Sequence, residues 1–519
     1  MKNKKYRLFL ISGKQKHRHY VVQIEFARLL GKRKVITNLA LPVLASLTPD
    51  HYDIKIIDEE IIPIPKNDLP DIVGITISAA TLKRSYEIAD WYRSKGVKVI
   101  FGGSYITFIP EEGILHADSV VIGEAEGIWE KVLEDFEKGE LKQIYKSDNR
   151  CEYKTAKMPR WDLVDTSKIL SLGVQASRGC PYQCEFCLVS QMFGRKVRFR
   201  DVDDVIEEIK NLPIKKFLFV DDNLTINKKY AKELLAKLKP LGYSWSCQAS
   251  LDLAKDEELL KEMADAGCHY LLMGFESVNK DSLNETSKHQ NKVAEYEEAI
   301  HRIHKAGMEI YGSFVIGFDN DTLDEFDNIF DFTMKANLPL VILSILGATP
   351  GTDLFARLEK EGRWYGSDTD YRGGTFPVIH YNKISQSDIF EKYVETIERL
   401  YSWDTLKTKA LNLFGKGYFV EEYENEDATF IMKFKISFLI TRLFLFSRDK
   451  SKRALFLALF KMFRKKQVAV SKVVVFLLHA EGTHRHIQKM KLNMDEYREM
   501  IKSVDQGTWE EIQQRNKAS

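Results

Sequence analysis

Short apolar runs and amphipathic stretches alternate along the first part of the chain. In residues 1–150 the apolar runs predict strands at 6–12, 52–58, 71–77, 97–103 and 119–123. Helical periodicity lies between some of these runs, most clearly over 82–95 and 127–138. Strands that alternate with helices form parallel sheets with both faces covered. We therefore expect an α/β domain at residues 1–150, built on a doubly wound, Rossmann-like sheet.

The same alternation resumes after residue 171 and continues to residue 365. Apolar runs predict strands at 172–176, 216–220, 243–249, 269–275, 309–318 and 340–346. Helical stretches between them lie at 202–211, 228–238, 257–266, 293–306 and 322–336. Successive βα units of this kind bend into a partial (β/α)6 barrel of the TIM type, with its site at the carboxyl ends of the strands. The charged stretch 151–171 before the barrel contains Pro159 and is typical of a linker.

Residues 366–519 have helical periodicity and contain one unusual segment. We expect the amphipathic stretch 384–401 to cap the mouth of the barrel. Between residues 428 and 478 there are twelve Lys and Arg residues against the single acid Asp449, interleaved with Phe and Leu. Basic, aromatic-rich helices suit the surface of an anionic membrane. Two alternatives stay open: helices packed on the barrel with their bases in solvent, and RNA binding.

Composition limits the classes of protein that remain. With 519 residues and 44 % apolar content the chain can bury more than one core. Its net charge of +2 gives no overall signature of nucleic-acid binding. Six cysteines, half of them in one short motif, argue against a disulfide framework and for a reducing, cytoplasmic compartment. The basic N-terminus is followed by only a short apolar run, and no run of about 18 uncharged apolar residues predicts a spanning helix.

The strongest chemical signal is a set of three cysteines directly after the strand predicted at 172–176. Cys180, Cys184 and Cys187 have the spacing C-x₃-C-x₂-C. Three thiolates from one loop can hold three corners of a cubane iron–sulfur cluster, and the fourth iron then stays open to a small molecule. A structural zinc site would need a fourth Cys or His nearby, and the neighbouring sequence has none.

This motif resembles the signature of the radical S-adenosylmethionine (SAM) superfamily, which has an aromatic residue before the last cysteine, here Phe186. The resemblance implies a [4Fe-4S] cluster, SAM bound to its open iron, and an external one-electron donor of the flavodoxin or ferredoxin type. It also implies SAM contacts from Asp222 and Asn223 after the second barrel strand, from Glu276 at the end of the fourth, and from Ile316 and Gly317 on the fifth. Gln248 lies on the third strand and could point into the barrel, where we expect it to contact the cofactor. The carboxylates among them could instead cap helices. We expect capping for Asp321 and Asp324.

The first domain, placed before such a core, resembles the cobalamin-binding domain of B12-dependent radical SAM enzymes. Polar and glycine residues follow its strands: Thr76, Ser78, Gly102, Gly103 and Glu124. The resemblance implies that cobalamin lies at these strand ends, where ligands of parallel sheets bind. The D-x-H-x-x-G motif of other cobalamin proteins is missing, because residues 58–63 read Asp-Glu-Glu-Ile-Ile-Pro. The lower axial ligand of cobalt therefore stays open.

Together these resemblances imply a cobalamin-dependent C-methyltransferase acting on an unactivated carbon of a lipid or other hydrophobic metabolite. The segment 348–363 and the cysteine loop read much as they do in hopanoid C-methylases. Cyclisation or rearrangement by the same cofactors is the alternative. A tRNA methylthiotransferase would need further cluster cysteines before the barrel, and a cobalamin sensor would not need an open iron. We expect a cytoplasmic enzyme that also contacts the inner membrane face peripherally.

Overall fold

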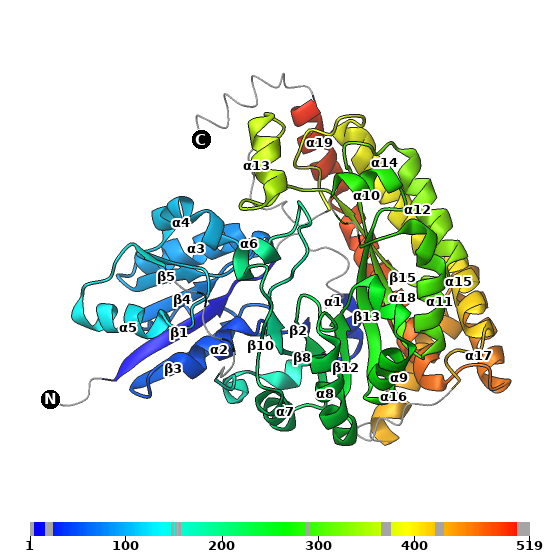
Figure 1. Cartoon of the computed structure of the whole chain (residues 1–519), viewed down its shortest axis with the longest axis horizontal. Helices are drawn as coiled ribbons and strands as arrows, with labels where there is room; N and C mark the ends of the chain where they lie inside the picture. The colour runs from blue at the N-terminus through cyan, green and yellow to red at the C-terminus, as the bar shows by residue number, and fades with distance from the viewer. Residues whose placement is uncertain are drawn as a thin grey trace. The chain divides into compact units, whose positions relative to one another are not determined.

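The computed structural model describes residues 5–505, except 16–23, 147–149, 151, 152, 154–156, 287, 289, 365–374 and 421–429. Parts of the predicted linker, and the start of the predicted C-terminal region, lie outside the described residues. The chain divides into two compact units. The first comprises Met1–His19, Ile36–Ser244 and Gly347–Ile379, and the second comprises Tyr20–Val35, Trp245–Leu346 and His380–Ser519. Figure 1 traces the chain by colour from blue at its N-terminus to red at its C-terminus.

A six-stranded parallel sheet forms the N-terminal part of the first unit. Its order is β3-β1-β4-β5-β6-β7, and all its neighbours pair in parallel. The strands are β1 (Tyr6–Ser12), β3 (Tyr52–Asp58), β4 (Ile72–Thr76), β5 (Lys98–Gly102), β6 (Ser119–Ile122) and β7 (Ile144–Lys146). The order reverses between β1 and β4, which makes this the switch point of a doubly wound fold. The predicted Rossmann-like sheet is confirmed.

Two separate cores cover the two faces of this sheet. Alternate residues of β1 point to opposite faces, so Phe9 and Ile11 enter one core while Leu8 and Leu10 enter the other. The first core is completed by α3 (Leu82–Arg93) and the second by α2 (Ala40–Leu47) and α5 (Trp129–Lys138). Burial on both faces explains why these strands read as continuous apolar runs.

A second sheet carries the barrel strands in the order β15-β14-β13-β12-β11-β8-β2. Apart from the short edge strand β2 (Lys34–Ile36), the strands follow one another in chain order, as in an open barrel. They are β8 (Ile169–Val174), β11 (Lys216–Phe219), β12 (Ser244–Gln248), β13 (Cys268–Glu276), β14 (Glu309–Ile316) and β15 (Leu340–Ile345). The helices between them are α7 (Val202–Lys210), α8 (Lys228–Leu238), α9 (Glu257–Asp265), α11 (Tyr296–Lys305) and α12 (Asp324–Lys335). The predicted partial (β/α)6 barrel is confirmed.

The C-terminal region is helical, as predicted, and belongs largely to the second unit. After α13 (Asp353–Lys360) come α14 (Gln386–Leu400), α15 (Trp403–Gly415), α16 (Phe430–Ile440), a π-helical turn (Thr441–Leu445), α17 (Lys450–Arg464), α18 (Val470–Lys491) and α19 (Met494–Asp505). Helix α14 packs along β15 beside α12. The Tyr401 hydroxyl donates a hydrogen bond of 2.6 Å to the Val341 carbonyl of β15. The expectation that this helix caps the barrel mouth is therefore wrong, because it completes the outer helix layer.

The long helix α18 also packs against α1 (Ile24–Leu29), which comes from the other end of the chain. The ring of Phe26 stacks on His479 with centroids 3.9 Å apart. A Cβ at Gly482 would lie 2.7 Å from the Phe26 amide nitrogen, so this close approach requires glycine. Among the described residues, no helix combines the length and the apolar character that a bilayer span needs.

Candidate active site

The three cysteines lie in the loop of a small hairpin that follows β8 in the first unit. Its strands, β9 (Ser177–Arg178) and β10 (Arg198–Phe199), pair antiparallel. The amide of Cys180 donates a hydrogen bond of 3.3 Å to the Gly194 carbonyl, so the loop folds back on itself. Gly179 has a φ of +100°, and a Cβ there would lie 2.9 Å from the Gly194 oxygen. Only glycine fits this close crossing of the backbone.

Cys180, Cys184 and Cys187 form no disulfide and are half-buried. Burial, together with smaller contributions from the nearby Cys184, Cys180 and Asp222, raises the pKa of Cys187 to about 11. Three thiolates this close repel one another unless cations balance them. Among the described residues, no three His, Cys, Asp or Glu side chains are placed to ligate a single metal ion. In a cubane cluster each thiolate binds a different iron, so this donor set fits a cluster. Phe186 lies in the same loop.

Two aspartates after β11 hold the hairpin in place. Asp222, predicted to contact SAM, accepts a hydrogen bond of 3.1 Å from the amide of Gly179, next to the first cysteine. Burial raises its pKa. Asp221 is fully buried and accepts from the Ala176 amide at 3.0 Å and the Ser177 hydroxyl at 2.6 Å. Burial raises the pKa of Asp221 to about 7. Asp221 was not among the predicted site residues, although an Asp-Asp pair after a buried strand was a signal for it.

Asn223, the third residue of this turn, is also buried and accepts a hydrogen bond of 3.2 Å from the Thr225 hydroxyl. The first unit therefore gathers the three cysteines and both predicted SAM-contacting residues of this turn around one hairpin.

The predicted cobalamin residues lie at the carboxyl ends of β4, β5 and β6. Thr76 and Gly102 are partners in the β4–β5 register. A Cβ at Gly102 would meet nothing closer than 4.0 Å, whereas a Cβ at Gly103 would lie 2.6 Å from the Ile77 carbonyl. Gly103 therefore serves a close backbone crossing, and Gly102 leaves open space. Ser78 closes a capping box with Thr81 at the start of a 3₁₀ turn.

Glu124, after β6, has a different environment. Its carboxylate binds Arg198 of β10, with a hydrogen bond of 2.9 Å from Nη1, and lies 3.6 Å from the guanidinium of Arg178. The carboxylate of Glu126 also forms an ion pair with Arg178, whose Nη2 lies 2.7 Å from Glu126 Oε1. The loop after β6 is thus fastened to both strands of the cysteine hairpin. No sequence pattern indicated these pairs, because their members are 52 to 74 residues apart.

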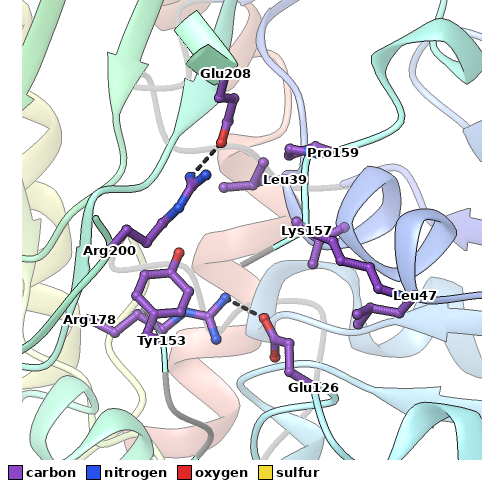
Figure 2. A pocket seen from close by; sticks show the side chains of 10 residues that line it. Leu39, Leu47, Glu126, Tyr153, Lys157, Pro159, Arg178, Arg200 and Glu208 are labelled. Carbon is purple, nitrogen blue, oxygen red and sulfur yellow. Dashed lines mark hydrogen bonds and ion pairs between the residues drawn. The ribbon is translucent and has the colours of Figure 1, made fainter. Parts of the chain in front are cut away.

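Beside this network is a small cavity, shown in Figure 2, lined by Glu126, Tyr153, Arg178, Arg200 and Glu208 among others. The guanidinium of Arg178 lies 4.2 Å from the centre of the Tyr153 ring. Arg200 and Glu208, both buried, form a second ion pair. The cavity measures about 20 Å³, which holds at most one water molecule. It is a structural void among ion pairs and not a substrate pocket.

In the second unit, the carboxyl ends of β12, β13 and β14 carry the other predicted SAM residues. Gln248 ends β12 and is half-buried, and Glu276 ends β13. Glu276 has a φ of +64°, an uncommon value outside glycine, and its carboxylate forms an ion pair with Lys288. Ile316 is fully buried at the end of β14, next to Gly317. Since β12, β13 and β14 are parallel neighbours, these residues share one edge of the sheet.

Asp321 corrects a prediction in this region. Helix α12 begins at Asp324, the residue before it is Leu323, and Asp321 does not cap it. Instead the buried Asp321 carboxylate accepts hydrogen bonds of 2.9 and 3.0 Å from the amides of Gly317 and Phe318, and it accepts one from the Ser282 hydroxyl. Burial raises its pKa to about 6. It thereby shapes the turn that presents Gly317, whose φ is +113°.

Residues 174–333 match the radical SAM superfamily, and residues 352–496 match a domain of unknown function, DUF4070. Over 407 residues the chain is 31% identical to the bacteriochlorophyllide d C-8(2)-methyltransferase of Chlorobaculum tepidum, covering 73% of this chain and 89% of the relative. It is 27% identical to the hopanoid C-2 methylase of Rhodopseudomonas palustris, covering 66% of this chain and 67% of that protein. The radical SAM methyltransferase TsrM of Kitasatospora setae, solved with cobalamin and a [4Fe-4S] cluster, has a similar fold. Its TM-score is 0.58 at 13% identity, over 89% of this chain and 99% of TsrM.

Proposed function

Since the chain belongs to the radical SAM superfamily, we propose that it is a cobalamin-dependent C-methyltransferase for an unactivated carbon of a hydrophobic metabolite. The resemblance inferred from the cysteine spacing is confirmed, and the protein is a radical SAM enzyme. One observation carries the proposal most directly: three cysteines outside disulfides lie in one hairpin loop of a chain whose relatives are methyltransferases.

Cys180, Cys184 and Cys187 would hold the cluster, since they are the half-buried thiols of that loop. When bound, the cluster supplies one electron that cleaves SAM and allows hydrogen to be removed from an unactivated carbon. The chain contributes position: Gly179 lets the loop turn, and Asp222 fixes its amide.

For SAM we propose contacts from the residues that the sequence predicts: Phe186, Asp222, Asn223, Gln248, Glu276, Ile316 and Gly317. Glu276 is the best supported, because a non-glycine residue with positive φ at a strand end is typical of functional constraint. Gly317 is supported by the buried Asp321, which orients its amide.

For cobalamin we propose contacts at Thr76, Ser78, Gly102, Gly103 and Glu124. The open space beside Gly102 would let a large planar ligand approach the backbone. The two arginine contacts of Glu124 give its carboxylate a positioning role, because they tie the strand ends to the cysteine hairpin. Bound cobalamin would supply the methyl group.

As a radical SAM enzyme the protein needs an electron donor and acts on a small molecule. We propose a flavodoxin or ferredoxin as the donor and a lipid or hopanoid-like compound as the substrate. Cytoplasmic placement fits cysteines that form no disulfide, since thiols stay reduced there. A hydrophobic substrate makes peripheral contact with the inner face of the membrane useful.

The test is an anaerobic assay of both SAM products. The purified protein, with its cluster reconstituted, receives methylcobalamin, SAM, reductant and lipid extracts of its source. We expect 5′-deoxyadenosine and S-adenosylhomocysteine together, with one methylene of added mass in a lipid. If 5′-deoxyadenosine forms without S-adenosylhomocysteine and no lipid gains mass, methyl transfer would be refuted. Cyclisation or rearrangement would then be the proposed reaction. Cys268→Ala, at a thiol buried in β13, is a control that keeps the cluster loop intact.

A further inference from the structure

The helices α16 and α17 expose aromatic side chains to an unusual degree. The exposed phenylalanines of the described residues all lie between residues 434 and 463: Phe434, Phe438, Phe446, Phe460 and Phe463. Their exposed fractions run from 37% to 76%. Single exposed apolar residues are ordinary on protein surfaces, but a concentration of aromatic rings marks an interaction site.

Helical spacing gathers these rings on outward faces. On α16 and the π-helical turn after it, Phe434, Phe438 and Arg442 follow one another at intervals of four residues. On α17, Leu455, Leu459 and Met462 are buried, and the helix packs on α15 and α18. Its opposite side carries Leu457, Phe460, Lys461 and Arg464. The inward side of α17 is therefore packed against other helices of the protein, and the outward side exposes rings and cations to solvent.

The rings of α17 are held in a row. The buried Phe444 stacks on Phe456 with centroids 6.5 Å apart, Phe456 stacks on Phe460 at 6.2 Å, and Phe460 contacts Phe463 at 6.4 Å. The row leads from the core to the surface. Its outer members are therefore ordered by their neighbours, and docking would cost little side-chain entropy.

Positive charge surrounds this row without compensation. Eight exposed bases lie on the same segment: Lys435, Arg442, Arg448, Lys450, Lys461, Arg464, Lys465 and Lys466. Within the part of the chain that the structure describes, none of these eight forms an ion pair with an acid. The segment's one acid, Asp449, accepts from the Lys452 amide and caps α17. The more buried bases do have partners, since Lys452 pairs with Glu481 and Lys472 with Glu309.

We propose that this surface, called here the basic aromatic face, docks on the anionic phospholipid surface of a membrane. Exposed bases bind acidic headgroups, and the rings enter the boundary between headgroups and acyl chains. RNA shares the charge requirement and its bases can stack on aromatic rings, but the aliphatic Leu457, exposed on the outward side of α17, favours the acyl chains of a lipid surface. The inference deepens the proposed function by naming a partner, because a hydrophobic substrate would dissolve in the same membrane. The surface itself is argued independently of that substrate.

The test is co-sedimentation of the full chain with vesicles of phosphatidylcholine alone, or of phosphatidylcholine mixed with phosphatidylglycerol. We expect binding to the mixed vesicles that weakens with salt, and little binding to the neutral ones. The variant K461Q/R464Q/K465Q/K466Q should weaken binding by at least about 50-fold, since each base near an anionic surface contributes about fivefold. F434S/F438S should weaken it by about tenfold or more at unchanged charge.

The matched charge control is K95Q/K146Q/K305Q/K416Q, which removes four exposed bases elsewhere and should leave binding within about twofold. Equal binding by the wild type and both face variants would overturn the proposal. So would RNA binding that the four-base variant loses while vesicle binding stays unchanged. Vesicle binding needs no cofactor, so a protein that binds vesicles but cleaves no SAM would refute the proposed function alone. SAM cleavage without vesicle binding would refute only the docking.

Discussion

The cysteine hairpin and the basic aromatic face are both rich in cationic side chains, and they treat those side chains in opposite ways. In the hairpin, Arg178, Arg198 and Arg200 are shielded from solvent, and each contacts a carboxylate. On the basic aromatic face the eight exposed bases have no acidic partner within the described residues. Buried cations must be paired, whereas exposed cations can stay available. Pairing with a carboxylate therefore distinguishes cations that stabilise the fold from cations that are available to bind another molecule.

The largest expected effect comes from the cluster loop that the paired arginines support. Cys184→Ser removes one iron ligand, so bound iron and sulfide should fall and SAM cleavage should drop to the reagent background. Iron analysis, the visible absorption of the cluster and 5′-deoxyadenosine release measure this. Cys268→Ala should keep all three. If the Cys184→Ser protein still cleaves SAM, the cysteine loop does not hold the cluster that cleaves it.

Breaking a buried pair should destabilise the fold strongly. Arg200→Met leaves the Glu208 carboxylate buried without its cation, and we expect a loss of about 3–5 kcal/mol in unfolding free energy. The double variant Arg200→Met/Glu208→Leu should recover most of this loss, since both charges leave the interior together. Denaturant titration gives both values. An additive double variant would mean that the two side chains do not act as a pair.

Asp221 should make stability depend on pH. Burial raises its pKa to about 7, so the folded state keeps a proton that the unfolded chain loses near its ordinary value. This group's contribution to stability is present at acid pH and is lost as the pH rises towards 7. Asp221→Asn mimics the protonated form. Relative to this variant, the wild type should lose about 2 kcal/mol between about pH 5 and pH 8. Parallel pH curves for the two proteins would show that folding does not raise the pKa of Asp221.

The smallest effect on stability should come from the basic aromatic face. Removing its four bases, as in K461Q/R464Q/K465Q/K466Q, should change the unfolding free energy by less than about 0.5 kcal/mol, because no buried group loses a partner. The same variant should change vesicle binding strongly. A large loss of stability would mean that these bases stabilise the fold, as the arginines of the hairpin do, and would contradict the difference between the two regions.

Sequence reasoning located the elements that are long and buried. The strand predicted at 52–58 coincides with β3, and the helix predicted at 228–238 coincides with α8, because buried faces leave a clear period in the sequence. The short strands β7, β9 and β10 were not predicted, since two or three residues carry no period. Among side chains, the cysteines could be found from their spacing alone.

Side-chain interactions between residues far apart in the sequence could not be predicted from spacing or periodicity. The pairing of Glu124 with Arg198 joins residues 74 positions apart. Asp321 was expected to cap a helix because it stands just before one. It turns back to the Gly317 amide instead, since that amide is buried and needs an acceptor.

The contact between α1 and α18 has a consequence for folding during synthesis on the ribosome. Glu25 bonds to Lys489 at 2.8 Å across 464 positions, and Phe26 stacks on His479. A ribosome adding about 5–20 residues per second needs roughly 20–90 s to reach α18 after it has made α1. Throughout that time Phe26, which ends up buried, lacks the His479 ring that stacks on it. A holding chaperone on the first residues should therefore raise the yield of this protein more than one that acts after release.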